Sequence, residues 1–372
     1  MKILLVASMF PPDKGVSTLR MSFFHSSLSE QHKVDILKFG ELTDLNGPIK
    51  TIDKRLFASL ITTLMHRNKI LAILEKTLAS YDLIIISAPP YNIYEIAYAA
   101  NRLGIKFIID LRDQPDLIYS ELKNTGNHFL LKSKELLTNR YINKIARKAA
   151  FVSCVGGISS AITQKQLTGR GITVINVHNG FQEKDLDFAR NLVTHRSVNS
   201  DRLIIGCVGS LHRFRSTPDL HYTLKELNSF SRKIVIRHWG MLCKDIESAL
   251  SSLENIEYLK LPQVSRCDLI QELAKVDAFL LPCSDDLIWE PTTSVFDYIL
   301  FDKPVIFCGL RNNEAFAILQ TVGQRIVTSE AVQHFDNILT LPSRKSDDKT
   351  RIYSRENSFL RFVNSMRNFE NE

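Results

Sequence analysis

Two arginines follow a Gly-Ser turn in the stretch "VGSLHRFR" (208–215). Gly209 comes directly after an apolar run, and glycine lets a backbone approach a ligand closely. Arg213 and Arg215 follow it, and a guanidinium group matches the oxygens of a phosphate in pairs. A single arginine at a strand end is usually a surface residue, but two after such a turn favour contact with a phosphate.

The most informative polar stretch is "LLPCSDDLIWEPTTSVFDYILFDKPVIFCG" (280–309). It predicts a strand, an acidic loop, a helix that opens at Pro291 and a further strand from about Pro304, because proline suits the first position of a helix. The first N–H groups of a helix are free, and together with the helix dipole they form an anion site. Here they belong to Thr292, Thr293 and Ser294.

Two carboxylates accompany that predicted helix. Glu290 stands at its entry, and Asp297 lies about two turns further along. A carboxylate beside a phosphate site accepts hydrogen bonds from hydroxyl groups, such as those of a sugar or a ribose. Capping of the helix by an acid is an equally simple interpretation for Glu290 but a weak one for Asp297. The "SDD" stretch (284–286) is interpreted as an acidic loop, so we expect no metal site.

Short apolar runs alternate with helical patterns along the whole chain, which is typical of parallel sheets with helices on both faces. The sequence therefore predicts an α/β fold. The expected strands cover residues 2–7, 33–39, 82–87, 106–111, 151–155, 173–177, 203–210, 233–240, 256–260, 278–283, 304–308 and 325–327.

The 372 residues are enough for two such domains with separate cores. We expect an N-terminal domain over 1–182, a polar linker over 183–202, a C-terminal domain over 203–345, and a final helix within 346–372 that packs back towards the first domain. Two parallel sheets joined in this way predict a ligand cleft between the domains, near the carboxyl ends of the strands.

Several classes of protein are disfavoured. No apolar run approaches the roughly 20 residues that span a bilayer, and the first apolar run lacks a cleavage site typical of a signal peptide. The six cysteines form no C-x-x-C pair and indicate reduced thiols in the cytoplasm. Neither G-x-G-x-x-G after the first strand nor a P-loop sequence is present, which argues against a standard nicotinamide dehydrogenase or a P-loop enzyme.

The basic excess lies in the first half of the chain. Residues 1–180 contain 23 Lys and Arg against 14 Asp and Glu, whereas the whole chain has 47 against 40. Much of it falls in two stretches with helical spacing, 50–80 and 122–148. A basic amphipathic helix binds an anionic membrane surface, and a solvated outer face is the alternative. Nucleic acid is disfavoured because no binding module or interleaved aromatic residues accompany the charge.

Several stretches, in order along nearly the whole chain, resemble the family-4-like nucleotide-sugar glycosyltransferases of GT-B fold, most of all the bacterial enzymes that build O-antigen, capsule and other surface polysaccharides. They are "FPPDKGVSTLR", "DLIIISAPPYNIYEIA", "FIIDLRDQP", "VINVHNGF", "GSLHR", "IQELAKVDAFLLP", "EPTTSVFDYILFDKPVI" and "YSREN". The resemblance implies two Rossmann-like domains that face each other across a cleft.

For the first domain, the resemblance implies that Gly15 approaches the donor diphosphate and the acceptor, and that Arg20 lies on the acceptor side. "DLRDQP" resembles a loop that faces the acceptor. Asp113 is therefore the candidate for orienting or deprotonating the acceptor hydroxyl. Arg112 is assigned to the acceptor side, with internal pairing to a nearby aspartate as an equal alternative. His178, in "HNGF", is interpreted as a strand-end histidine.

For the second domain, the resemblance implies that Arg213 neutralises the donor diphosphate, with Arg215 as its companion. Gln263 and Val264 occupy the loop that seats the nucleotide base in related enzymes, although a plain loop is the more cautious interpretation.

The E-x7-E signature of the family is changed here. Asp297 replaces the ribose-binding glutamate, and a one-residue shift of the loop brings Glu290 to the sugar hydroxyls. Ser294 stands where many relatives have lysine, so other groups must supply part of the positive charge.

The resemblance further implies transfer of a sugar from a nucleotide-sugar to a glycan acceptor that is lipid-linked, with retention of configuration and without a metal or other cofactor. It places the protein in the cytoplasm, with peripheral contact at the inner face of the cytoplasmic membrane. Two alternatives stay open: a nucleotide-sugar epimerase of similar architecture, and a catalytically inactive partner subunit.

Overall fold

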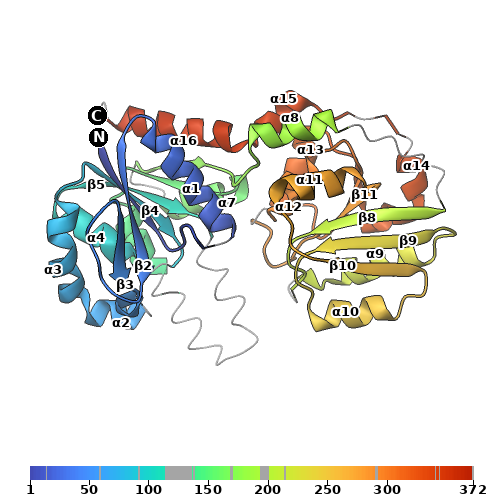
Figure 1. Cartoon of the computed structure of the whole chain (residues 1–372), viewed down its shortest axis with the longest axis horizontal. Coiled ribbons are helices and arrows are strands. Elements are labelled where there is room, and N and C mark those ends of the chain that lie inside the picture. The colour runs from blue at the N-terminus through green and yellow to red at the C-terminus, as the bar shows by residue number, and fades with distance from the viewer. Residues whose placement is uncertain are drawn as a thin grey trace. The chain divides into compact units, whose positions relative to one another are not determined.

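The computed structural model describes residues 1–13, 15–57, 60–90, 93–113, 136, 139–167, 171–192, 201–212, 215–289, 292–339, 341–342 and 344–370. They form two compact α/β units, of which one comprises Met1–Asn179 and Phe359–Glu372 and the other Gly180–Ser358 (Figure 1). Each unit is described by itself below.

The first unit contains a seven-stranded parallel sheet in the order β3-β2-β1-β4-β5-β6-β7. Its elements are β1 (Lys2–Ala7), α1 (Val16–Ser29), β2 (Lys33–Gly40), β3 (Ile49–Asp53), the 3₁₀ helix η1 (Lys54–Phe57), α2 (Leu60–Met65), α3 (Arg67–Leu78), β4 (Leu83–Ala88), α4 (Tyr94–Arg102), β5 (Lys106–Leu111), β6 (Phe151–Cys154), α7 (Gly157–Leu167) and β7 (Thr173–Asn176).

Alternate residues of β1 pack on opposite faces of this sheet, as the geometry of a strand requires. Ile3 and Leu5 belong to the core under α1, whereas Leu4 and Val6 belong to the core under α3 and α4. Strands buried on both faces are continuous apolar runs. This explains why "KILLVA" shows no polar alternation.

The final helix, α16 (Arg355–Glu370), begins in the second unit and ends in the first. Its Phe362 is fully buried in the α1 core, with ring centroids 5.0 Å from Phe24 and 5.3 Å from Phe151. The aromatic side chains of this helix therefore complete the core of the first unit.

The second unit contains a six-stranded parallel sheet in the order β10-β9-β8-β11-β12-β13. Its elements are α8 (Glu183–Asn191), β8 (Arg202–Val208), α9 (Pro218–Asn228), β9 (Lys233–Trp239), α10 (Lys244–Ser251), β10 (Ile256–Leu261), α11 (Arg266–Ala274), β11 (Ala278–Pro282), α12 (Ser294–Tyr298), β12 (Val305–Cys308), α13 (Glu314–Val322), β13 (Ile326–Thr328), the 3₁₀ helix η4 (Ser329–His334), α14 (Phe335–Leu339) and α15 (Asp347–Arg351).

The α/β fold class and all twelve expected strands are confirmed, each within about two residues at either end. A thirteenth, β3, is a correction, because the stretch 50–80 is not one amphipathic helix. Its first residues form an edge strand, followed by η1, α2 and α3. The reason is that "IKTID" is an edge strand in which Lys50, Thr51 and Asp53 are polar, so it contains no continuous apolar run.

The structure describes only parts of the expected linker and of the second basic stretch. The expected linker 183–202 contains α8, which buries Leu186 within the second unit, and 193–200 lie outside the described residues. Of the basic stretch 122–148, residues 139–146 are helical, and 122–135 and 137–138 lie outside the described residues.

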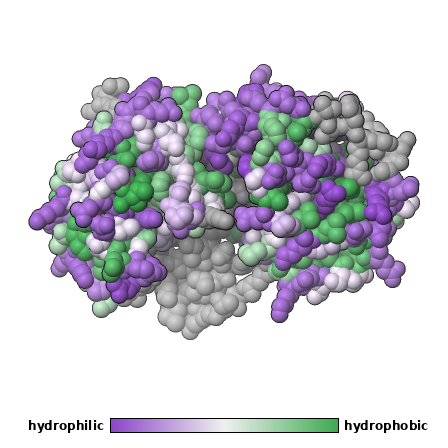
Figure 2. Space-filling view, viewed as in Figure 1, coloured by the Kyte–Doolittle hydropathy of each residue, from purple (hydrophilic) through white to green (hydrophobic). Residues whose placement is uncertain are grey.

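Hydrophilic residues cover much of the molecular face shown in Figure 2. Within the described ranges, no helix has the length and apolar character that crossing a membrane requires.

Candidate functional site

The order of the second sheet reverses between β8 and β11. Chain order runs outward from β8 to β9 and β10 on one side, and from β11 to β12 and β13 on the other. In open parallel sheets, ligands bind outside the carboxyl ends of the strands at such a switch point. The loops after β8 and β11, which contain Gly209 and Thr292 respectively, therefore begin at the place where a site is expected.

Gly209 directly follows β8 and has φ +96°, a conformation that favours glycine. Its N–H donates to the Trp239 carbonyl at 2.9 Å, and its own carbonyl accepts from His238 Nε2 at 2.7 Å. A Cβ placed on Gly209 would lie 3.7 Å from a terminal nitrogen of Arg215. The turn is therefore held from the sheet side and bordered by a guanidinium group.

Tyr298 of α12 connects the two loops. Its hydroxyl accepts a hydrogen bond from the Val208 N–H at 2.8 Å and donates to the Leu280 carbonyl at 3.0 Å. The ring is fully buried and stacked on Phe279 at 4.4 Å. The end of β8 and the helix after β11 are thus fixed to each other by one side chain.

The helix after β11 begins at Ser294, three residues later than the start predicted at Pro291, which is a correction. Tight turns precede it, in which Val295 N–H donates to Thr292 and Phe296 N–H to Thr293. The backbone N–H groups of Thr292, Thr293 and Ser294 donate to no other residue that the structure describes. Glu290 and Pro291 lie outside the described residues.

Arg215 is half-buried and has no carboxylate partner in the described part of the chain. The pKa of the His212 ring is lowered by partial burial and by the nearby Arg215 charge. Arg213 lies outside the described residues. Because a partly desolvated cation needs compensation, Arg215 and the N–H groups of Thr292, Thr293 and Ser294 together suit an anion.

Asp297, the predicted ribose-binding residue, is paired with an arginine. Its Oδ1 accepts a hydrogen bond from Arg266, the first residue of α11, and Arg266 also donates to Asp185 Oδ2 at 3.0 Å. Gln263 is exposed and Val264 half-buried in the loop that leads into α11. Sequence reasoning missed Arg266, because 31 residues separate it from Asp297 and no local pattern pairs them.

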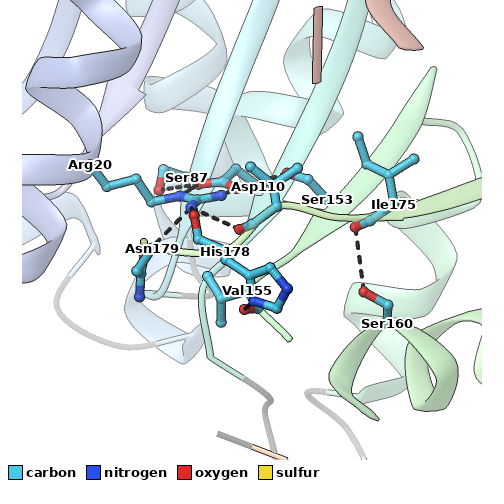
Figure 3. A network of polar contacts seen from close by, with 10 residues as sticks. Arg20, Ser87, Asp110, Ser153, Val155, Ser160, Ile175, His178 and Asn179 are labelled. Carbon is cyan, nitrogen blue, oxygen red and sulfur yellow. Dashed lines mark hydrogen bonds and ion pairs between the residues drawn. The ribbon is translucent and has the colours of Figure 1, made fainter. Parts of the chain in front are cut away.

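In the first unit, Arg20 is buried and bound to Asp110 by two hydrogen bonds of 3.0 and 2.6 Å (Figure 3). Its remaining terminal nitrogen donates to the carbonyls of Val177 and His178 at 2.9 and 3.2 Å. Burial alone would raise the pKa of the Asp110 carboxyl, but the Arg20 charge and hydrogen bonds from Arg20 and Ser153 outweigh it and hold the pKa below its ordinary value. Arg20 thus joins α1 to the end of the sheet.

The other first-unit candidates lie along the same carboxyl edge. Gly15 is the exposed N-cap of α1, with φ +134° and open space where a Cβ would stand. Arg112 donates to Ser8 Oγ at 3.3 Å and to the Pro89 carbonyl at 2.5 Å. Asp113, two residues after the end of β5, is half-buried.

His178 has the character expected of a strand-end histidine. Its Nδ1 donates to the Val155 carbonyl at 3.1 Å and its Nε2 accepts from Asn176 at 3.0 Å. Burial, and then the Arg361 charge, lower its pKa to about 3. The described residues contain no group of three or more His, Cys, Asp or Glu side chains placed to hold a metal ion.

A scan against protein-family models and a search of curated proteins find no match to this chain. Solved structures do match over the whole length. Anabaena Alr3699/HepE in complex with UDP and glucose has a TM-score of 0.64 at 14% identity, over 99% of this chain and 100% of that one. The lipopolysaccharide outer core galactosyltransferase WaaB has a TM-score of 0.63 at 14% identity, over 98% and 99%.

The chain has the GT-B fold. The UDP-GlcNAc 2-epimerase from Methanocaldococcus jannaschii is also similar, with a TM-score of 0.56 at 13% identity over 98% of this chain and 99% of that one. Likenesses at this level of identity establish the architecture, while the chemistry has to be argued from the residues of this chain.

Proposed function

We propose that this chain is a glycosyltransferase that moves a sugar from a nucleotide-sugar donor to a glycan acceptor. One observation carries the proposal: at the switch point of the second sheet, Arg215 has no carboxylate partner among the described residues and Thr292, Thr293 and Ser294 offer undonated N–H groups. A diphosphate is the part of such a donor that brings matching negative charge. The similarity to HepE, solved with UDP and glucose, and to the galactosyltransferase WaaB supports this choice.

In this proposal, breaking the bond between the anomeric carbon and the diphosphate oxygen leaves positive charge on the sugar and negative charge on the diphosphate. Arg215, Arg213 and the N–H groups before α12 stabilise the leaving group, because positive charge and N–H donors favour the negative charge that develops there. These cations neutralise the charge of the diphosphate, which a metal ion does in other enzymes. The proposal therefore includes neither a metal nor another cofactor. Transfer proceeds with retention, and the leaving phosphate accepts the proton of the acceptor hydroxyl.

The remaining candidates take the roles that the family resemblance implies. Glu290 binds sugar hydroxyls, and Asp297 uses the oxygen that Arg266 leaves open for a ribose hydroxyl. The loop with Gln263 and Val264 seats the base. On the acceptor side, Asp113 orients the acceptor hydroxyl.

Arg20 and Arg112, which are bound within the first unit, support the acceptor side by fixing the strand ends. Gly15 leaves room for a ligand at the start of α1.

A thermal-shift panel of UDP-, GDP-, ADP- and dTDP-sugars tests the donor class. We expect one class to raise Tm, because a ligand that binds only the folded state stabilises it by mass action. Incubation of that donor without acceptor should leave it unchanged. An isomerised nucleotide-sugar would instead establish an epimerase, and no binding of any donor would indicate an inactive partner subunit.

We further propose that the acceptor is a lipid-linked glycan of a surface polysaccharide such as O-antigen or capsule, reached at the inner face of the cytoplasmic membrane. The basic excess of residues 1–180 favours an anionic surface. In the first unit, Met65 and Leu64 are 78% and 41% exposed, and the exposed Lys69 follows four residues after Met65 in the sequence. These residues combine an apolar contact with positive charge.

Vesicle sedimentation tests this contact. We expect more protein to sediment with phosphatidylglycerol vesicles than with phosphatidylcholine vesicles, and Met65→Asp to reduce the bound fraction, because a carboxylate is costly in an anionic interface. Met241→Asp is the matched control, since Met241 is a similarly exposed methionine (72%) of the second unit. Equal sedimentation with both lipids would rule out the membrane contact.

A further inference from the structure

His238, near the end of β9, is fully buried and forms two short hydrogen bonds. Its Nε2 lies 2.7 Å from the Gly209 carbonyl oxygen, and its Nδ1 lies 2.6 Å from the Tyr258 hydroxyl. A carbonyl oxygen only accepts, so Nε2 carries the hydrogen. In the neutral ring Nδ1 then accepts from the Tyr258 O–H, and Tyr258 selects this tautomer.

The ring is neutral near pH 7. Burial lowers the pKa of His238, and the charges of Lys260 and Arg215 lower it further, while the hydrogen bond to Gly209 acts in the opposite direction. A neutral ring with one fixed N–H is a directional donor, and here it points at the turn after β8.

The Gly209 carbonyl oxygen lies close to Gly240. A Cβ on Gly240 would lie 2.1 Å from the Gly209 oxygen, so glycine at 240 is what admits the turn. The Gly209 N–H is bound as well, to Trp239 at 2.9 Å. The peptide between Gly209 and Ser210 is thus held by its carbonyl against the end of β9.

This orientation has a consequence for Ser210. In a planar trans peptide the N–H points opposite to the C=O, and the bond between Gly209 and Ser210 is not among the cis peptides of the described chain. With the carbonyl turned to His238, the Ser210 N–H points away from it. That N–H donates to no other residue within the described ranges. The Arg215 guanidinium borders the same turn.

We propose that His238 is a positioning residue for the donor site: by binding the Gly209 carbonyl it directs the Ser210 N–H, next to Arg215, at the diphosphate of the nucleotide-sugar. The inference rests on the proposed function and adds a backbone donor to it. Tyr258 acts one step further away by fixing the tautomer of His238.

Two amide variants separate this role from general packing. In His238→Gln, the amide nitrogen takes the place of the histidine Nε2 and can still donate to the Gly209 carbonyl. In His238→Asn, the amide nitrogen takes the place of Nδ1, so no donor faces Gly209. With UDP, GDP, ADP and dTDP as probes, we expect His238→Asn to raise the Kd of the tightest binder about tenfold and His238→Gln to raise it less than about threefold. Equal Kd values for the two variants would overturn the proposal.

Tyr258→Phe is the milder variant should the amides fail to fold. We expect it to raise the nucleoside diphosphate Kd about threefold. Tyr81→Phe is its matched control, because the Tyr81 hydroxyl also donates a 2.6 Å hydrogen bond, to Asp35. Tyr81 and Asp35 belong to the first unit and lie near the amino ends of its strands, away from the carboxyl edge where its candidate residues lie. If both variants lower Tm and neither changes the Kd, Tyr258 is merely structural and the proposal fails.

Nitrogen-15 NMR of the unaltered protein decides the tautomer without any variant. We expect a neutral His238 protonated at Nε2, whose signal shifts when the nucleoside diphosphate is added. A ring protonated at Nδ1 alone would overturn the positioning role whatever the protein binds. If the ring is as described and none of the four diphosphates binds, the proposed function has failed instead.

Discussion

Replacing Arg215 by alanine is expected to lower the rate of sugar transfer about 100- to 1,000-fold, the usual loss when one group that stabilises transition-state charge is removed. The loss should appear in kcat as well as in the donor KM, because charge on the diphosphate grows as the anomeric bond breaks. Tm should change little, since no carboxylate of the described chain depends on Arg215 for pairing.

Steady-state kinetics with the donor selected by the thermal-shift panel measures this effect. Arg311→Ala is the matched control, because Arg311 forms an exposed ion pair with Glu330 in the same unit and should keep the unaltered rate. Arg215→Lys should recover part of the activity, since lysine keeps the charge but loses the paired geometry. A loss below about threefold for Arg215→Ala would contradict the assignment of this cation to the diphosphate.

Replacing Arg20 by leucine is expected to destabilise the first unit by about 3–5 kcal/mol, because it leaves the buried Asp110 carboxylate without its cation. Among the described residues, the hydroxyls of Ser87 and Ser153 would then be its remaining donors, at 3.1 and 2.7 Å. Urea denaturation measures the loss. Adding Asp110→Asn should recover part of it, because the double variant leaves no unpaired charge.

The pH dependence has a definite sign. The folded pKa of Asp110 lies below its ordinary value, so the stabilisation is present above the unfolded pKa of about 3.9 and is lost as the pH falls through the folded pKa. The gap in stability between the unaltered protein and Arg20→Leu should therefore narrow in acid. Arg55→Ala, which breaks an exposed pair with Asp53, should change stability little at any pH. A gap that widens in acid would contradict this account.

The sheets could be predicted from sequence because strands buried on both faces are apolar throughout, and such runs are visible without knowledge of their neighbours. β3 was not predicted because three of the five residues of "IKTID" are polar, so this edge strand contains no continuous apolar run. The start of α12 was misplaced because Pro291 suits a first helical position, whereas the tight turns at Thr292 and Thr293 delay the helix.

The site was harder to predict than the fold because its contacts join distant parts of the chain. Gly209 and Arg215 could be predicted because they follow an apolar run that predicts a strand. No local pattern shows that Asp297 is bound to Arg266. The same holds for Arg20 and Asp110, which are 90 residues apart. His238 did leave a signal that was missed: a polar residue near the end of the apolar run "KIVIRHWG", two positions before a glycine. Only the fold reveals that both residues serve the turn at Gly209.

The passage of α16 from one unit to the other bears on how the protein is made. Translation delivers Met1–Asn179 first, but Phe362 and Met366, which fill the core beneath α1, emerge only after the entire second unit. During translation, part of the apolar core of the first unit therefore stays uncovered until α16 has been synthesised. This differs from the common case in which domains fold in order of synthesis. Cutting the gene at residue 179 would not yield a well-folded fragment, whereas appending Phe359–Glu372 to that fragment would restore the missing contacts.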